Sequence, residues 1–243
     1  MISFIKHLIK KLPVDITLNQ KYDTQTRKVI EKHCSADSNC TDVGCHKGEI
    51  MDLFLQYAPN GHHIGFEPIP ALFENLRLKY AGHAHCTVSD IALSNQKGTS
   101  SCNYVVSNPA YSGLVKRTYD RKDEKDTSIS VITDLLDNVI PAGHKTDLIK
   151  IDVEGGEYQV LKGAVNTLKN AKPIVIFEHG LGASECYGTT PQQVFELFRE
   201  CNYEITTMDS WLKGKKCFSL AEFEEQYHKA INYYFLAYPV NKS

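Results

Sequence analysis

The chain has 243 residues, which is enough for one domain with a full hydrophobic core. Its formal net charge is -2, so the composition offers no basic face of the kind that nucleic-acid-binding proteins use, and we expect no nucleic-acid partner. The eight cysteines form no C-x-x-C pair, which argues against a zinc ribbon, and several lie in apolar segments as buried thiols do. Cysteine usage therefore predicts a reducing, cytoplasmic environment.

Residues 1–38 are expected to form a helical lead-in to a single main domain at residues 39–243. Apolar residues recur at helical spacing near its start: Ile2, Ile5, Leu8, Ile9 and Leu12. Two interpretations remain open, a short helix packed on the domain or a basic amphipathic helix that touches a membrane surface. No stretch reaches the ~20 apolar residues of a membrane-spanning helix. Residues 15–38 are predicted to be polar and irregular, with a helical patch at residues 26–33.

The stretch CTDVGCHKGE, residues 40–49, is the first motif that suggests a chemistry. Asp42 and Gly44 end a predicted strand, and Gly48 opens a predicted helix. At such a turn an α/β nucleotide-binding fold brings its backbone toward a ligand. The helix N-terminus adds unpaired N–H groups and a partial positive charge. His46 stands where the fingerprint G-x-G-x-x-G has its middle glycine, so an ordinary strand-to-helix turn is the alternative.

Acidic residues follow the next two predicted strands. HHIGFEP is expected to form a strand that ends at Glu67, between helices at residues 50–57 and 70–80. An acidic residue roughly 20 positions past a glycine turn is where such folds grip a ribose diol, because a carboxylate accepts from both hydroxyls. Asp90 follows the third strand, in HCTVSDIAL, where it would accept from an adenine amino group. The alternatives are a solvated glutamate and a turn-forming aspartate.

The alternation of strands and helices stops after residue 98, and a polar insert is expected near residues 99–130. SSCNYVV alternates like a strand, and an unusually long polar loop follows it. Long loops in compact domains are usually functional or disordered. The candidates to bind or cover an acceptor are Tyr111, Ser112, Gly113, Lys116 and Arg117. A solvated, charged excursion of the chain is an equal alternative.

The alternation resumes with two buried strands that end on charged residues. DLIKIDVEGGE is predicted to form a strand ending at Asp152 and Glu154, followed by a helix at residues 158–168. PIVIFEHG is predicted to form the next strand, ending at Glu178 and His179. Helix, strand, helix and a final strand, NYYFLAYP, complete the chain. This order predicts an α/β sheet with helices on both faces.

Five of these segments resemble the FkbM family of S-adenosylmethionine-dependent methyltransferases: DVGCHKGE, GFEPIP, SDIALS with NQKG, DLIKIDVEGGEYQVLKGA and PIVIFEHG. They occur in the family's order over residues 42–182, and DLIKIDVEG with VLKGA is the most specific of them. The resemblance implies a class I methyltransferase fold. Such a fold is a Rossmann-like three-layer α/β sandwich with a seven-stranded, mostly parallel sheet and an antiparallel last strand.

The same resemblance implies where S-adenosylmethionine binds. The cofactor would lie over the glycine turn, with its ribose on Glu67 and its adenine near Asp90 and Ile91. The implied cofactor-binding residues are Asp42, Gly44, Cys45, His46, Gly48, Glu67, Pro68, Asp90, Ile91 and Asp152. Family members commonly carry Ala-Asn-Ile between the two glycines, and this chain has Cys45-His46-Lys47. Asn and His both offer hydrogen bonds, and the alternative is that His46 faces the reaction centre.

Methyl transfer is an in-line displacement at a sulfonium carbon, and an alcohol must lose its proton as the new bond forms. Ligands bind outside the carboxyl ends of the strands, which places Asp152, Glu154, Glu178 and His179 around the acceptor, with His46 across the cleft. Two mechanisms remain open. Either His179 or Asp152 is the general base, or Asp152 and Glu178, with His179 or a water, hold Mg²⁺. Alternatively, Asp152 and Glu154 only cap the following helix.

The resemblance points to O-methylation of a hydroxyl on a sugar or another small secondary-metabolite acceptor. The polar, aromatic insert suits a saccharide, since Tyr111 would stack on a sugar ring. Two other classes of function remain open. A nicotinamide-dependent oxidoreductase would also use an acidic residue at Glu67, but the chain lacks G-x-G-x-x-G. An inactive methyltransferase fold that serves as a binding module is the second. The sequence indicates no oligomeric state.

Overall fold

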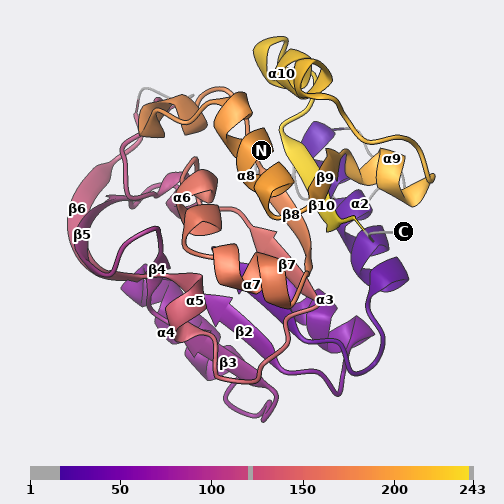
Figure 1. Ribbon diagram of the computed structural model, residues 1–243. Helices are drawn as coiled ribbons and strands as arrows, with labels where there is room; N and C mark the ends of the chain where they lie inside the picture. The colour runs from indigo at the N-terminus through magenta and orange to yellow at the C-terminus, as the bar shows by residue number, and fades with distance from the viewer. Residues whose placement is uncertain (1–16, 120–122, 241–243) are drawn as a thin grey trace.

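The computed structural model describes residues 17–119 and 123–240, so the amphipathic segment expected at the N-terminus lies outside the described residues (Figure 1). The main sheet has seven strands in the order β3-β2-β1-β7-β8-β10-β9. These are β1 Cys40–Val43, β2 His63–Phe66, β3 Cys86–Ser89, β7 Leu148–Ile151, β8 Ile174–Glu178, β9 Tyr203–Thr206 and β10 Tyr234–Pro239. The last strand, β10, runs antiparallel to β8 and β9, whereas β3, β2, β1, β7 and β8 pair in parallel. The predicted sheet is confirmed.

Helices cover both faces of the sheet. The helices are α2 Leu18–His33, α3 Glu49–Tyr57, α4 Pro70–Lys79, α5 Leu136–Val139, α6 Glu157–Lys162, α7 Val165–Asn170, α8 Pro191–Glu200, α9 Met208–Leu212 and α10 Leu220–His228. Figure 1 shows α5, α6, α7 and α8 in front of the sheet, with α2 and α3 behind it. The fold is therefore the expected three-layer sandwich.

Successive residues of each strand enter different hydrophobic cores. Ile149 and Ile151 pack with α6, α7, α8 and α10, whereas Leu148 packs with α2, α3, α4 and α9. Side chains alternate across a strand, so Lys150 and Asp152 share the α2/α3 face with Leu148. This alternation decides which charged residues meet at the end of the sheet.

The predicted polar insert contains a second, three-stranded sheet. β5 Gly98–Val105 pairs antiparallel with β6 Asp126–Asp134, and β4 Ala92–Leu93 pairs in parallel with β6. Figure 1 shows the β5–β6 hairpin curving along one side of the molecule. The connecting loop forms a 3-10 turn, η1 Pro109–Tyr111, and returns to β5 where Gly113 bridges Asn103. The sequence predicts the strand at SSCNYVV, which is part of β5, but not its pairing with β6 in a separate sheet.

The helical lead-in is longer than predicted. The helical patch expected at residues 26–33 is confirmed, but the expectation of an irregular segment before it is wrong, because α2 begins at Leu18 and runs for 16 residues. Thr17 caps it, accepting from the Gln20 N–H while the Gln20 side chain accepts from the Thr17 N–H. Most residues of this helix are polar, and only a narrow stripe of it is buried, which includes Val29 and Ile30.

The helix predicted at residues 158–168 is two short helices, α6 and α7. They break at Gly163, where a Cβ would lie 2.2 Å from the carbonyl oxygen of Ser94. The backbone of the β4 exit therefore passes too close for a side chain at this position. Farther on, α8 begins at Pro191, with Thr190 as its cap.

Candidate cofactor and active site

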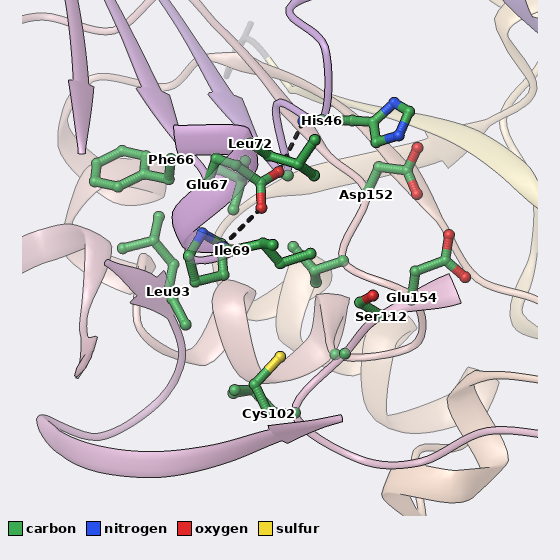
Figure 2. Close-up of a pocket in the computed structure, with 18 of the residues that line it drawn as sticks. His46, Phe66, Glu67, Ile69, Leu72, Leu93, Cys102, Ser112, Asp152 and Glu154 are labelled. Carbon is green, nitrogen blue, oxygen red and sulfur yellow. Dashed lines mark hydrogen bonds between the residues drawn. The ribbon is translucent and has the colours of Figure 1, made fainter. Parts of the chain in front are cut away.

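A cavity that opens to solvent lies at the edge of the sheet where β1, β2 and β7 end (Figure 2). Its apolar side includes Phe66, Ile69, Leu72, Ile91 and Leu93, and Pro68 lies among them. Its polar side includes Gly44, His46, Glu67, Asp152 and Glu154. The insert lines a further part of the cavity with Cys102, Ser112, Gly113 and Leu114. In Figure 2, Glu67 and Ile69 lie on one side of this space and Asp152 and Glu154 on the other.

Gly44 brings the turn after β1 against the end of β7. Its φ is +88°, and a Cβ here would lie 1.9 Å from the carbonyl oxygen of Asp152. Gly48 also has a positive φ, and a Cβ here would lie 2.4 Å from the Tyr80 hydroxyl. Only glycine fits such contacts in the left-handed region. Gly44 therefore permits close backbone packing at the cavity. Gly48, an expected cofactor-binding residue, leaves room for the Tyr80 hydroxyl and does not line the cavity.

Glu67 is the buried acceptor at the end of β2. It is 4% exposed, and its two carboxylate oxygens accept from the backbone N–H groups of His46 at 2.8 Å and Ile69 at 3.0 Å. Burial raises the pKa of Glu67 to about 7, although these two hydrogen bonds oppose the shift. Each oxygen keeps a second lone pair, so Glu67 can also accept from a diol in the cavity.

His46 contributes its imidazole to the cavity wall and its backbone to Glu67. Its φ is +50°, an uncommon conformation for a residue other than glycine. Burial lowers the pKa of His46, although Glu49 opposes the shift. The imidazole is therefore neutral at pH 7 and has a nitrogen that accepts a proton.

Asp42 lies beneath the turn and does not line the cavity. It is 1% exposed, and neither carboxylate oxygen has a hydrogen-bond partner within the described part of the chain. Burial raises the pKa of Asp42 to about 6, and the charge of Lys150 opposes the shift. Asp42 and Lys150 are register partners on adjacent strands, β1 and β7.

Asp152, Glu154 and Glu178 each place a carboxylate oxygen within 4.8 Å of the other two. Lys150 donates to Asp152 at 2.6 Å, and Arg117 forms an ion pair with Glu154. Burial would raise the pKa of Asp152, but the charge of Lys150 and several hydrogen bonds hold it below its ordinary value. Burial and the charge of Asp152 raise the pKa of Glu154 to about 8 and that of Glu178 well above its usual range.

The sequence suggests Asp152 and Glu178 as ligands for Mg²⁺, and Glu154 lies beside them. The ammonium of Lys150 and the guanidinium of Arg117 already pair with two of these three carboxylates. A divalent cation would lie beside both positive charges, which is electrostatically unfavourable. The residues present therefore do not fit a magnesium site.

Several expected site residues lie outside the cavity. His179 is 1% exposed and stacks on Tyr227 and Phe223 of α10, so it faces the opposite side of the sheet from Asp152. Asp90 is exposed and does not line the cavity, although its neighbour Ile91 does. The thiol of Cys45 is buried and donates to the backbone carbonyl of Asp42.

The candidate acceptor residues of the insert mostly contact one another. The Arg117 guanidinium lies 5.1 Å from the ring centroid of Tyr111, and Tyr111 stacks on Tyr119 at 6.3 Å. Ser112 lines the cavity, but its hydroxyl accepts from the Val105 N–H. These contacts hold the loop over the cavity.

Sequence reasoning missed two side chains that bond Asp152, namely Lys150 and Tyr234. Tyr234 opens β10, and its hydroxyl donates to Asp152 Oδ2. The signal for Lys150 is present, since it is a charged residue inside the apolar strand LIKI. Tyr187, whose hydroxyl accepts from the Val115 N–H, was missed as well because nothing in its local sequence marks it.

The sheet order, the antiparallel last strand and the ligand cavity outside the strand ends define a class I methyltransferase-like fold. The chain belongs to the FkbM methyltransferases, since the family model "Methyltransferase FkbM domain" matches residues 42–205, more than half of the chain. This membership disfavours the oxidoreductase alternative.

Two curated relatives and one solved structure are similar to the chain. Methyltransferase sdnD of Sordaria araneosa is 25% identical over 56% of this chain and 66% of its own length. Hexuronic acid methyltransferase AglP of Haloferax volcanii is 27% identical over 75% of this chain and 71% of its own. The structure of methyltransferase FkbM from Methylobacillus flagellatus KT superimposes with a TM-score of 0.53 at 14% identity, covering 84% of this chain and 44% of that chain. The chain thus spans less than two thirds of the first of these relatives and under half of that structure.

Within residues 17–119 and 123–240, no helix combines the length and the apolar character that crossing a bilayer requires.

Proposed function

We propose that the cavity binds S-adenosylmethionine and that the protein is an O-methyltransferase. The observation that carries this proposal is one continuous cavity that joins the Gly44 turn, the buried carboxylate of Glu67 and an apolar slot at Phe66 and Leu93. A slot of this kind suits a purine, and a buried carboxylate suits a ribose diol. The remaining end, at Gly44 and Asp152, would hold the amino-acid part.

Bound S-adenosylmethionine would supply an electrophilic methyl group. The chain's own tasks are to align an acceptor hydroxyl, exclude water and take up the hydroxyl proton. Of the four expected catalytic residues, only His46 and Asp152 line the cavity. We assign the proton to His46, because its imidazole is neutral and the negative charge of Asp152 favours its protonated form. The proton passes to the imidazole as the oxygen forms its bond to carbon.

The acceptor we propose is a sugar-type hydroxyl compound. Two observations support this class. One curated relative is a hexuronic acid methyltransferase. The loop of the insert that borders the cavity is polar and aromatic, as saccharide sites are. Ser112 lies on the wall, whereas Tyr111, its neighbour in the chain, does not line the cavity and contacts Arg117.

The test uses S-adenosylmethionine with a labelled methyl group and three acceptors: a hexuronic acid glycoside, a neutral glycoside and a polyketide alcohol. We expect label in a glycoside and a loss of about 100-fold in turnover for His46→Gln. His228→Gln, at the exposed end of α10, is the matched control and should be unaffected. Transfer to the polyketide alone would overturn the sugar assignment, and full activity in His46→Gln would remove its role as base.

A further inference from the structure

Lys150 and Tyr234 converge on one oxygen of Asp152. The ammonium of Lys150 lies 2.6 Å from Oδ2 of Asp152, and the Tyr234 hydroxyl donates to that same oxygen. The Lys150 ammonium also lies 5.7 Å from the ring centroid of Tyr234. β10 runs antiparallel to β8, so its first residue reaches the edge of the sheet where β7 ends. Two strands far apart in the chain thus supply both donors.

Lys150 faces the interior, whereas Asp152 reaches the cavity. The side chain of Lys150 is 8% exposed and that of Asp152 is 25% exposed. A buried ammonium is costly unless it is paired, and Lys150 lies on the same sheet face as two carboxylates, Asp42 and Asp152. Lys150 does not line the cavity, so any effect it has on a ligand must act through Asp152.

Asp152 is the carboxylate best placed for the amino-acid end of the cofactor. Three carboxylates line the cavity, those of Glu67, Asp152 and Glu154. Glu67 lies at the apolar end beside Ile69, and Glu154 is paired with Arg117. Asp152 lies directly against the Gly44 turn, since a Cβ on Gly44 would meet its carbonyl oxygen.

We propose that Lys150 and Tyr234 are positioning residues: by occupying Oδ2 of Asp152 they turn Oδ1 toward the cavity, where it accepts from the ammonium group of S-adenosylmethionine. This inference rests on the proposed function. It assigns no contact with the ligand to Lys150 or Tyr234. It predicts that both residues affect only ligands that carry the amino-acid part.

A purely structural role makes a different prediction. If Lys150 and Tyr234 only stabilise the sheet, their loss weakens every ligand of the cavity to the same extent. S-adenosylhomocysteine and 5′-methylthioadenosine separate the two roles, because they share the adenosine and the thioether and only the first has the amino-acid part. The ratio of the two affinities therefore reports on the binding of the amino-acid part, at the Asp152 end of the cavity.

The experiment is calorimetric titration of both ligands into wild type, Tyr234→Phe, Lys150→Met and the control Tyr238→Phe. Tyr238 lies on the same strand and bonds Glu204 instead, away from the cavity. We expect S-adenosylhomocysteine to bind about tenfold more weakly to Tyr234→Phe and to Lys150→Met, because a charge-assisted hydrogen bond is lost. Affinity for 5′-methylthioadenosine should stay within about twofold. Tyr238→Phe should resemble wild type for both ligands.

Equal weakening of both ligands, or no change in either, would overturn the inference while leaving the proposed function intact. If Lys150→Met does not fold, Tyr234→Phe decides the question alone, since it removes only a hydroxyl. A wild-type protein that binds neither ligand would overturn the proposed function and this inference with it.

Discussion

Glu178 and His179 are neighbours in the chain and face opposite sides of the central sheet. Glu178 lies with Asp152 and Glu154 at the cavity edge, whereas His179 stacks on Tyr227 at 4.8 Å. The alternation of side chains along β8 imposes this separation. His179 therefore belongs to the packing between β8 and α10.

We predict that His179→Phe makes the stability of the fold less dependent on pH and leaves ligand binding unchanged. Burial lowers the pKa of His179 to about 4, so the unfolded chain, with a pKa near 6.5, takes up the proton first as the pH falls. Stability present at neutral pH is thus lost between about pH 6.5 and 4, by up to about 3 kcal/mol. Thermal unfolding should show a smaller fall in Tm from pH 7 to 5 in His179→Phe. Loss of S-adenosylhomocysteine binding in a folded variant would contradict this assignment.

Glu67 should make cofactor binding depend on pH. Its pKa of about 7 means that it is partly protonated in the free protein at neutral pH, and a ribose diol would bind the ionised form. We expect S-adenosylhomocysteine affinity to fall about tenfold from pH 8 to pH 6, with proton release on binding at pH 7. Titrations in buffers of different ionisation enthalpy measure that release. The same pH dependence in Glu67→Gln would assign the effect to another group.

Gly44→Ala should destabilise the protein strongly. The new methyl group would overlap the carbonyl oxygen of Asp152, and the φ of +88° adds backbone strain, so we expect a loss on the order of 3 kcal/mol or more. Gly82→Ala is the control, because a Cβ there has no atom within 4 Å among the described residues. Denaturant unfolding measures the free energy of unfolding of both variants. Nearly equal values would contradict the prediction and show that the turn relaxes around the added methyl group.

Methyl transfer should not require a divalent cation. Lys150 and Arg117 already neutralise two carboxylates of the acidic cluster. We expect turnover after treatment with a chelator to stay within about twofold of the untreated value, since the two positively charged side chains disfavour the binding of a metal cation beside them. Activity lost to the chelator and restored by Mg²⁺ would contradict this account and return Asp152 and Glu178 to the role of ligands.

The sequence predicts the main sheet well because several of its strands are short, buried runs followed by a glycine turn or a charged residue. Val43 with Gly44, and Ile151 with Asp152, are examples. It predicts α2 poorly, because few of its residues are apolar and its buried stripe includes Gln25 and Thr26. The β5–β6 sheet escapes prediction since pairing between distant segments leaves no local signal.

The candidate site is predictable in part. Gly44, His46, Glu67, Asp152 and Glu154 follow from motifs at strand ends, and all line one cavity. The contact of Tyr234 with Asp152 does not follow, because Tyr234 lies on a strand 82 residues away. The position of His179 is predictable, because side chains alternate along a strand and His179 therefore shares the α10 face with the buried Phe177.

The most direct test of the account is calorimetric titration of S-adenosylhomocysteine into wild type, Glu67→Gln and Glu74→Gln. Glu74 is an exposed glutamate on α4 paired with Arg77, and serves as the matched control. We predict micromolar binding to wild type and Glu74→Gln, with a loss of about tenfold or more in Glu67→Gln as the diol contact weakens. Absence of binding to folded wild type, or equal affinity in Glu67→Gln, would contradict the central claim that this cavity holds S-adenosylmethionine.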